Sequence, residues 1–531
     1  MSDTSKKQSF LHGTMLLAIS TALVKLIGAF YSIPLKHIIG DDGFSYYSTA
    51  YEIYTLLLMI STAGLPVAMS RMISQASSLG HYRQVRKIYT VSRTIFLSLG
   101  LLGALLMTVF CKQLANFQEQ PDAWAAIGTL GPCCFLICLM STYRGFFQGQ
   151  SNMKPTSVSQ VLEALCKLIV GLGAAVLLIM YTTVAAFPAA GAIFGVTMSC
   201  LVSCFYLNYC FRKAYKDLPV SNEDVSSGGD IAKGLLAIAI PITIGSAGLQ
   251  ILTVLETKIY MGQLLHTMTQ QSADVQKGIY NFTQKIFNMP CAFITPITIS
   301  AIPAITAQLT KKEFSAAKAT EESAARVTAL ISAPCAVGLA VLAGPVTGLL
   351  GGYTGQRHLL ATDLMAVLGI CILFNATVLL TNAIMQAHGH VNLPVINMFI
   401  GGIVKLVAVF ILTGNPEIGI LGTPIGSLLC YVCITILNLI TMAKVLPDAP
   451  RIVRNMLRAI LAAVIMGVVV FGVYYAIEAF LPPISRIISC GVPLGVGVVV
   501  YLFAAIKLRA ITRDDCLLLP KGQKIANLLH L

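Results

Sequence analysis

The chain has 531 residues, of which 56% are hydrophobic and only 11% are charged, and its mean hydropathy is +0.79. A water-soluble protein is about 45–50% apolar and about 25% charged, so this composition excludes a soluble globular protein. The net charge of +14 is not a nucleic-acid signal, because the basic residues fall between apolar segments. In that position they set membrane orientation and contact anionic lipid head groups.

The apolar segments predict an all-α integral membrane protein with fourteen transmembrane helices. A helix needs about 20 apolar residues to cross about 30 Å of hydrocarbon, and the connections between the segments are too short for a soluble domain. In chain order the predicted spans are 12–35, 46–70, 91–111, 123–143, 158–180, 188–210, 233–257, 283–308, 324–350, 361–385, 395–413, 418–441, 456–479 and 485–507.

The first span and the basic loops predict how the chain is oriented. The first span follows Lys6 and Lys7 as a signal peptide would, but it is long, contains Lys25 and lacks a small-residue cleavage site. We therefore expect it to stay in the protein. If the N-terminus is cytoplasmic, most lysines and arginines fall in cytoplasmic loops, which predicts that both termini are cytoplasmic.

Two halves of the chain resemble each other at a nearly constant offset. Lys167-Leu168 matches Lys405-Leu406, Gly64–Pro66 resembles Ala301–Pro303, and Gln148–Pro155 resembles Gln386–Pro394. Two parallel six-helix repeats predict two lobes, related by a pseudo-twofold axis along the membrane normal, that rock about a shared cavity. The predicted domains are an N-terminal lobe (1–215), a cytoplasmic linker (216–232), a C-terminal lobe (233–445), and two extra helices with a cytoplasmic tail (446–531).

Several ionisable residues lie inside the predicted spans, where a charge costs at least about 2.5–3.5 kcal/mol unless it faces water or a partner. Glu163 and Lys167 stand four residues apart with the acid first, which predicts a local pair on one helix face. Lys25, Lys285 and Lys405 have no opposite charge within a turn, which predicts a positive cavity that attracts anions. The alternative is that Lys25 pairs with Glu52, and Lys405 with Glu256, only to hold helices together.

Proline and cysteine add weaker signals. Pro290, Pro296 and Pro303 accompany Lys285 in the eighth span, and the backbone carbonyls that they free must find water or protein. This pattern predicts a broken, flexible helix that lines a cavity, with ordinary packing kinks as the alternative.

The cysteines lie almost wholly in apolar segments, so we interpret them as small lipid-compatible side chains and expect no metal or cofactor.

Four stretches carry a resemblance to a known family: Lys25–Leu35, Gly64–Pro66, Gln148–Pro155 and the tail Leu517–Gly522. They resemble the MOP-superfamily polysaccharide transporters, in particular the branch of the stage V sporulation protein B family and the MurJ-type lipid II flippases. The resemblance implies a flippase in the bacterial plasma membrane that moves an undecaprenyl-pyrophosphate-linked precursor, lipid II foremost, outward by alternating access. It also implies that the last two spans hold the polyprenyl tail. We expect a monomer whose partners are this substrate and anionic lipids.

The resemblance also implies roles for single residues. Lys25 occupies the place of a basic residue in helix 1, and Lys285, five positions before Pro290, that of one in helix 8. The other family arginines fall at Tyr31 and near Leu58, so those charges are not kept. The predicted substrate-binding residues are Lys25, Lys285, Glu52, Glu163 and Lys167.

A second implied site concerns ion coupling. Glu256 stands where the family has an acidic sodium ligand, and Lys405 stands where it has an asparagine ligand. We therefore expect Glu256 and Lys405 to form a coupling or cavity ion pair, with the ammonium in the place of sodium.

Other functions are less compatible with these residues. An exporter of another lipid-linked oligosaccharide fits equally well, whereas a MATE-like multidrug/cation antiporter would need unpaired acids in its cavity. A membrane enzyme is disfavoured, because Asp41-Asp42 are adjacent, His388 and His390 have no acid nearby in the sequence, and there is no P-loop. A non-transporting scaffold would not need so many ionisable groups within its spans.

Overall fold

The computed structural model describes the backbone of residues 3–446, 448–480 and 486–510. Side chains at 3–19, 22, 25, 61, 296–300, 480 and 486 are not part of that description, and the tail motif Leu517–Gly522 lies outside it. Within the described ranges the regular elements are all helices. The all-α membrane class is thus confirmed, because twelve helical stretches there are long and apolar enough to cross a membrane. The count of fourteen and the internal repeat stay predictions.

The chain divides into two compact units, Met1–Asn281 and Phe282–Leu531, which we call the N-terminal and C-terminal units. The domains predicted from the repeat, with a boundary near residue 233, rest on sequence similarity rather than on compactness and stay a prediction. The N-terminal unit contains α1 (Asp3–Thr62), α2 (Leu65–Ser78), α3 (Tyr82–Val109), α4 (Cys111–Phe117), the 3-10 helix η1 (Pro121–Ala123), α5 (Trp124–Gly149), α6 (Lys154–Tyr181), α7 (Ala186–Lys216), α8 (Gly228–Leu265) and the start of α9 (Gln270–Thr310).

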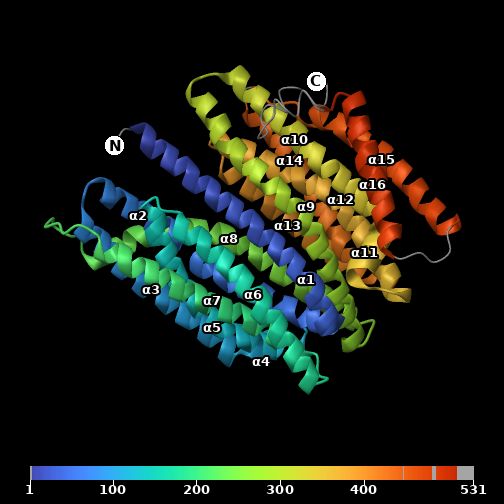
Figure 1. The fold of residues 1–531 in the computed structure, drawn as a ribbon, viewed down its shortest axis with the longest axis horizontal. Coiled ribbons are helices and arrows are strands. Elements are labelled where there is room, and N and C mark those ends of the chain that lie inside the picture. Colours follow the sequence, from blue (N-terminus) through green and yellow to red (C-terminus); the bar gives the residue numbers. More distant parts are fainter. Residues whose placement is uncertain (1–2, 447, 481–485, 511–531) are drawn as a thin grey trace. The chain divides into compact units, whose positions relative to one another are not determined.

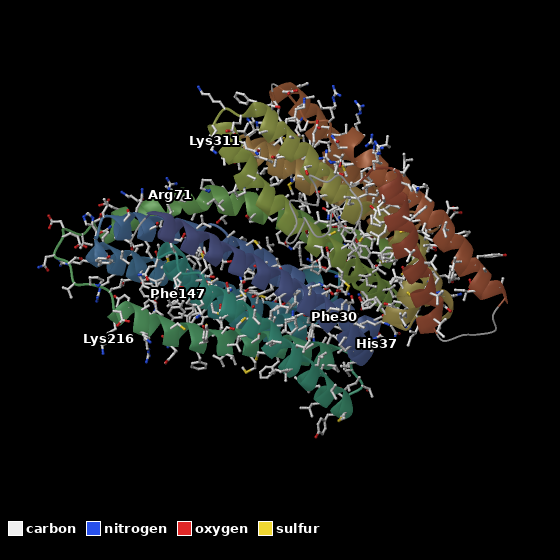
Figure 2. All side chains as sticks on the ribbon, turned by 45° about the horizontal axis from the view of Figure 1, so that its top comes forward. Phe30, His37, Arg71, Phe147, Lys216 and Lys311 are labelled. Atoms are coloured by element: carbon white, nitrogen blue, oxygen red, sulfur yellow. The ribbon has the colours of Figure 1, made fainter. Side chains whose placement is uncertain are left out.

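In the N-terminal unit, α5 and α7 form the buried centre. The helix α7 packs against α5 and α6, α3 packs against α5, and α8 covers part of α1 and α2 (Figure 1). Small residues allow close approach, since a Cβ at Gly195 of α7 would lie 2.2 Å from the Gly171 Cα of α6. Arg71 and Lys216 lie at one end of this unit and His37 lies toward the other (Figure 2), as expected for helices that alternate in direction.

The first two predicted spans form two helical segments of α1, which runs from Asp3 to Thr62 and changes direction at Gly40, where φ is 73° and ψ is −177°. The rings of Tyr31 and Tyr47 lie 6.3 Å apart, whereas sixteen residues of one straight helix would separate them by about 24 Å, so the chain turns back at Gly40. Only glycine adopts this conformation readily, and the turn is tighter than the predicted connection between residues 35 and 46. The chain then breaks at Gly64, and α2 begins at Leu65 with Pro66 in its first turn, where proline is favoured.

The eighth predicted span corrects a second expectation. The helix α9 runs continuously from Gln270 to Thr310 through positions 290, 296 and 303, so the prolines do not break it. A proline removes one backbone hydrogen bond, and neighbouring helices compensate for that loss inside a membrane protein. The helix also begins at Gln270 rather than at residue 283, which adds a polar segment ahead of the apolar part.

The C-terminal unit contains the rest of α9 followed by α10 (Phe314–Val341), α11 (Ala343–Gly351), α12 (Gly355–Ala387), α13 (Asn392–Thr413), the 3-10 helix η2 (Gly419–Leu421), α14 (Gly422–Val445), α15 (Ile452–Phe480) and α16 (Arg486–Lys507). The helix α10 packs against α12 and α15, α14 packs against α12 and α13, and α16 lies on α15. Alanine, isoleucine and methionine side chains of these helices form the apolar core. The two extra helices therefore share a core with α10.

Gly278 lies where α9 packs closely on the turn of α1 next to Gly40. A Cβ at this position would lie 2.0 Å from the Asp41 carbonyl oxygen. We expect Gly278→Ala to destabilise the protein by about 1–3 kcal/mol, the usual cost of overpacking, measured by equilibrium unfolding in mixed micelles. The matched control is Gly262→Ala in α8, where a Cβ has no atom within 4 Å and no loss is expected. Equal stability of the two variants would contradict the close contact.

Candidate functional site

A buried lysine connects three segments of the N-terminal unit. Lys277, in the first turns of α9, has no exposed surface. Its Nζ donates to Thr49 Oγ1 of α1 and to Gln120 Oε1, the latter at 3.0 Å, and lies 3.9 Å from Glu52 Oε2 of α1. Gln120 belongs to the connection just before η1. A buried ammonium needs such partners, because leaving one unpaired costs several kcal/mol.

An acid one turn before Lys277 extends this network. Asp274 accepts a hydrogen bond from Tyr46 Oη at 3.1 Å and another from Gln120 Nε2 at 2.7 Å. Glu52 in turn accepts one from Thr257 Oγ1 of α8 at 2.8 Å. We call this network the Lys277 cluster; its members are Tyr46, Thr49, Glu52, Gln120, Thr257, Asp274 and Lys277.

Sequence reasoning missed Lys277 and found only Glu52 of its partners. Lys277 precedes the predicted eighth span (283–308), which places it outside the segments whose charges point to a site. A signal was present, since Asp274 and Lys277 stand three residues apart next to an apolar segment, but their burial depends on how early α9 begins. Among the described side chains the ion-pair partner of Glu52 is Lys277. The predicted alternative, Lys25, lies on α1 with its side chain outside the described part of the structure.

A cavity of about 270 Å³ lies between α1, α5 and α6 of the same unit. We call it the N-unit cavity; it is lined by Thr21, Val24, Ile27, Gly28, Tyr31, Tyr51, Arg144, Gln160, Glu163, Ala164 and Lys167. The structure thus brings together two residues predicted to bind substrate, Glu163 and Lys167. It adds Arg144, which stands just after the predicted fourth span and which sequence reasoning missed.

The predicted local pair between Glu163 and Lys167 is wrong. Glu163 Oε2 lies 3.0 Å from Arg144 Nη2, and Arg144 Nε donates to Ser159 Oγ at 3.2 Å. Arginine takes this role because its planar guanidinium presents several donors in a fixed geometry. The helix periodicity did place Glu163 and Lys167 on one face, but α5 supplied a better partner for the acid.

Lys167 instead lies among tyrosine rings. Its Nζ donates to Tyr51 Oη at 2.9 Å and lies 4.6 Å from the centroid of that ring, 5.0 Å from that of Tyr31 and 5.9 Å from that of Tyr47. Ring faces stabilise a nearby cation. The charge of Lys167 is therefore held by aromatic faces and one hydroxyl, and no carboxylate is bonded to it among the described residues.

The other predicted site residues lie in both units. Glu256 is buried on α8 of the N-terminal unit, whereas Lys285 on α9 and Lys405 on α13 are half-buried in the C-terminal unit. All three have polar or electrostatic partners. The pairing of Glu256 with Lys405 and the joint role of Lys25 and Lys285 stay predictions.

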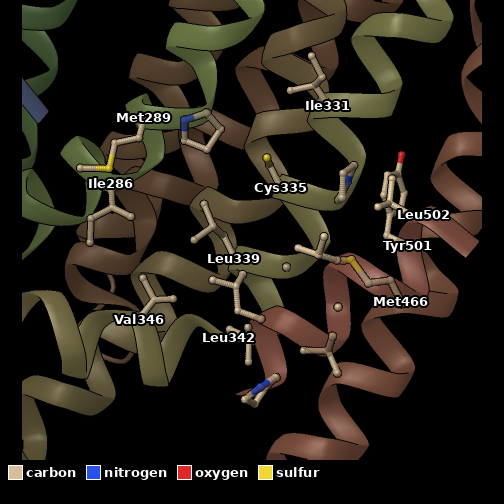
Figure 3. A pocket seen from close by; sticks show the side chains of 18 of the residues that line it. Ile286, Met289, Ile331, Cys335, Leu339, Leu342, Val346, Met466, Tyr501 and Leu502 are labelled. Carbon is tan, nitrogen blue, oxygen red and sulfur yellow. The ribbon is translucent and has the colours of Figure 1, made fainter. Parts of the chain in front are cut away.

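The C-terminal unit contains a larger, apolar cavity of about 530 Å³. We call it the C-unit cavity; α9, α10 and α11 supply one side of it and α15 and α16 the other. Figure 3 shows Ile286, Met289 and Leu339 facing Met466 and Tyr501 across it. The Tyr501 hydroxyl donates to the Leu330 carbonyl oxygen at 3.0 Å, so the wall presents hydrocarbon to an occupant.

His388 corrects one further expectation, that it has no acid nearby. Its Nε2 lies 2.7 Å from Glu321 Oε1, because α12 packs against α10. Within the described ranges, no group of three or more histidine, cysteine, aspartate or glutamate side chains is arranged to hold a metal ion. The pair therefore joins two helices of the C-terminal unit.

Membrane-length helices in two units, charged groups inside one unit and an apolar cavity inside the other define a multi-pass membrane protein. The chain belongs to the polysaccharide biosynthesis protein family, whose model matches residues 10–308. The resemblance identified from the sequence motifs is thereby confirmed.

Two curated relatives and two solved structures are similar to this chain. The chain is 26% identical to the stage V sporulation protein B of Bacillus subtilis (strain 168), covering 84% of this chain and 86% of that one. It is 24% identical to the lipid II flippase MurJ of the same organism, covering 94% and 95%. Its fold is similar to that of a lipid II flippase MurJ in an inward closed conformation, with a TM-score of 0.68, 14% identity and coverage of 93% and 99%. A multidrug resistance MATE family transporter in an inward-facing conformation gives a TM-score of 0.61, with 15% identity and coverage of 80% and 98%.

Replacing Lys277 should reveal how much its cluster stabilises the N-terminal unit. We expect Lys277→Met to lower the free energy of unfolding by about 3–5 kcal/mol, because removal of one partner leaves the buried Asp274 and the half-buried Glu52 without a cation. Equilibrium unfolding in mixed micelles measures the change. The double variant Lys277→Met with Glu52→Gln should recover part of the loss, and a single variant as stable as the parent would contradict the role given to the cluster.

Proposed function

We propose that this protein is a flippase that moves a polyprenyl-pyrophosphate-linked cell-wall precursor from the inner to the outer leaflet by alternating access. Lipid II is the cargo that we favour, because one relative that covers nearly the whole chain is named a lipid II flippase. The family assignment to polysaccharide biosynthesis supports a glycan-bearing cargo. In this proposal the chain is a transporter without enzymatic activity, acts as a monomer with both termini cytoplasmic, and contacts anionic lipids through its basic loops.

The observation that carries the proposal is the C-unit cavity. Its lining is almost entirely leucine, isoleucine, valine, methionine, proline and glycine, which suits a hydrocarbon chain and offers nothing to a polar solute. Burying apolar surface contributes about 25 cal/mol per Å², so a polyprenyl tail would bind there without hydrogen bonds. One wall comes from α15 and α16, the two helices outside the predicted repeat, and the resemblance implies this tail-binding role for them.

The head group requires cations instead. We propose that Lys25 and Lys285 hold the pyrophosphate, since lysine is a point charge suited to phosphate oxygens. Negative charge that moves outward runs down the inside-negative membrane potential and gains about 2.3 kcal/mol per charge per 100 mV. That gain drives the cycle without a coupled ion, provided that no protein charge moves with the cargo.

The charges of the N-unit cavity argue against a cation antiporter. Arg144 and Lys167 stand against the single acid Glu163, which is already bonded to Arg144. A site for organic cations would need the opposite balance. Export of another lipid-linked oligosaccharide remains a second candidate, because the same apolar cavity and the same lysines would hold its lipid pyrophosphate.

Transport of a fluorescent polyprenyl-pyrophosphate glycan by purified protein in liposomes tests the proposal. We expect Gly338→Leu to abolish flipping, because Gly338 lines the C-unit cavity and a Cβ there has only Met466 within 4 Å, at 3.8 Å, so the new side chain enters the cavity. Gly472→Leu on the exposed side of α15 is the matched control and should flip normally.

The two lysines are tested in the same assay. Lys25→Ala and Lys285→Ala should each abolish flipping while the amount of folded protein is unchanged. Full activity of Gly338→Leu together with both lysine variants would refute the proposed function.

Ion dependence tests the proposed role of Lys405. If its ammonium takes the place of sodium, the parent flips equally well with sodium or potassium, and Lys405→Asn should make flipping depend on sodium. The measurement compares initial flipping rates in the two salts at equal ionic strength. Unchanged sodium independence of Lys405→Asn would remove the support for this role.

A further inference from the structure

The N-unit cavity has more hydrogen-bond donors than the surrounding protein uses. A guanidinium has five N–H donors and an ammonium has three. Arg144 donates to Ser159 and Glu163, and Lys167 donates to Tyr51. The other donors of these two side chains have no acceptor among the described residues, and both side chains line the cavity. The cavity is therefore prepared for a ligand rich in acceptors.

The charge of the cavity selects the same kind of ligand. Arg144 and Lys167 carry two positive charges, Glu163 carries one negative charge, and the tyrosines are neutral donors and acceptors. The side chains of Arg144 and Glu163 are 18% and 28% exposed, so this ion pair is accessible from the cavity. In a site with little water an uncompensated positive charge attracts an anion more strongly than it would in bulk water.

The volume of the cavity and one unused hydrogen-bond acceptor limit which ligands can bind. A volume of about 270 Å³ is just below the about 300–1,000 Å³ of sites for drug-sized molecules, so the cavity suits a small group and excludes a whole glycan. Gln160 Oε1 is buried and has no hydrogen-bond partner among the described residues. A singly protonated phosphate supplies many acceptors and one hydroxyl donor, which matches this arrangement.

We propose that the N-unit cavity is a binding site for a phosphate or pyrophosphate group, held by Arg144 and Lys167 with Gln160 as the acceptor for its hydroxyl. This is a second anion site beside the one proposed for Lys25 and Lys285. Free inorganic phosphate and the head group of a lipid-linked cargo share the acceptor oxygens that Arg144 and Lys167 would bind, and only the free or singly esterified phosphate also carries the hydroxyl for Gln160. Only binding of the lipid-linked form rests on the proposed function, because inorganic phosphate binding requires no transport.

Direct binding to the purified full-length protein tests the site. Isothermal titration with inorganic phosphate and pyrophosphate forms one arm, and titration of protein-containing nanodiscs with polyprenyl phosphate forms the other. We expect Lys167→Met to raise the Kd about 10- to 100-fold, because it removes charged hydrogen bonds to the ligand. Lys216→Gln removes an equal charge from the exposed end of α7 and should bind normally.

A steric variant keeps the test valid if Lys167→Met does not fold. Gly28 lines the cavity and a Cβ there has no atom within 4 Å, so Gly28→Leu should fill the cavity and abolish binding with all charges retained. Gly173→Leu, on α6 and equally unobstructed, is its control. If the parent binds inorganic phosphate or pyrophosphate and both cavity variants lose that binding, free phosphate is a ligand of the site. If the parent binds only polyprenyl phosphate and both variants lose that binding, the ligand is the lipid head group. Absence of binding in both arms, or unchanged binding in Lys167→Met and Gly28→Leu, would overturn the proposal, whatever the flipping assay shows.

Discussion

Pairing of the buried Lys277 charge is the interaction on which the N-terminal unit depends. Lys277 has no contact with solvent, and a lone ammonium there would carry a desolvation cost of several kcal/mol. Its partners come from α1 and from the connection before α5, and Glu52 in turn is bonded to Thr257 of α8. These segments are far apart in the chain, so the network forms only when they pack. The network therefore joins α8, α9 and the Gln120 connection to α1, and Gly278 lets α9 approach α1 closely enough for the contact.

The two polar sites of this unit differ in how fully their charges are used. In the Lys277 cluster the cation faces Glu52 and is linked to Asp274 through Gln120, and Tyr46 and Thr257 complete the hydrogen bonds of these acids. Such a network rigidifies a bundle. In the N-unit cavity two cations share one acid, and part of the charge of Lys167 rests on tyrosine rings. A surplus of donors is useful only to a ligand, which is why structural roles fit the first site and binding fits the second.

The C-terminal unit differs in chemistry, because its cavity is apolar. Apolar side chains line almost all of it, and the polar end of Tyr501 is bonded to the backbone of α10. An amphiphile with an anionic head group and a long apolar tail needs both kinds of environment, and in this chain they are built in separate compact units. The similarity in fold to a MurJ flippase and to a MATE transporter shows that one scaffold accommodates different cargoes. The lining residues, rather than the fold, must select among them.

The sequence by itself determined the all-helical membrane class, the family, and the helix face that Glu163 and Lys167 share, because hydropathy and the helical repeat are properties of single segments. Only the tertiary structure decided the partners of the charges: Arg144 for Glu163, Lys277 for Glu52 and Glu321 for His388. It also decided that the chain turns back at Gly40 between the two segments of α1 and that α9 runs unbroken through its prolines. Ion pairs and helix continuity depend on what neighbouring helices supply, and periodicity within one helix does not contain that information.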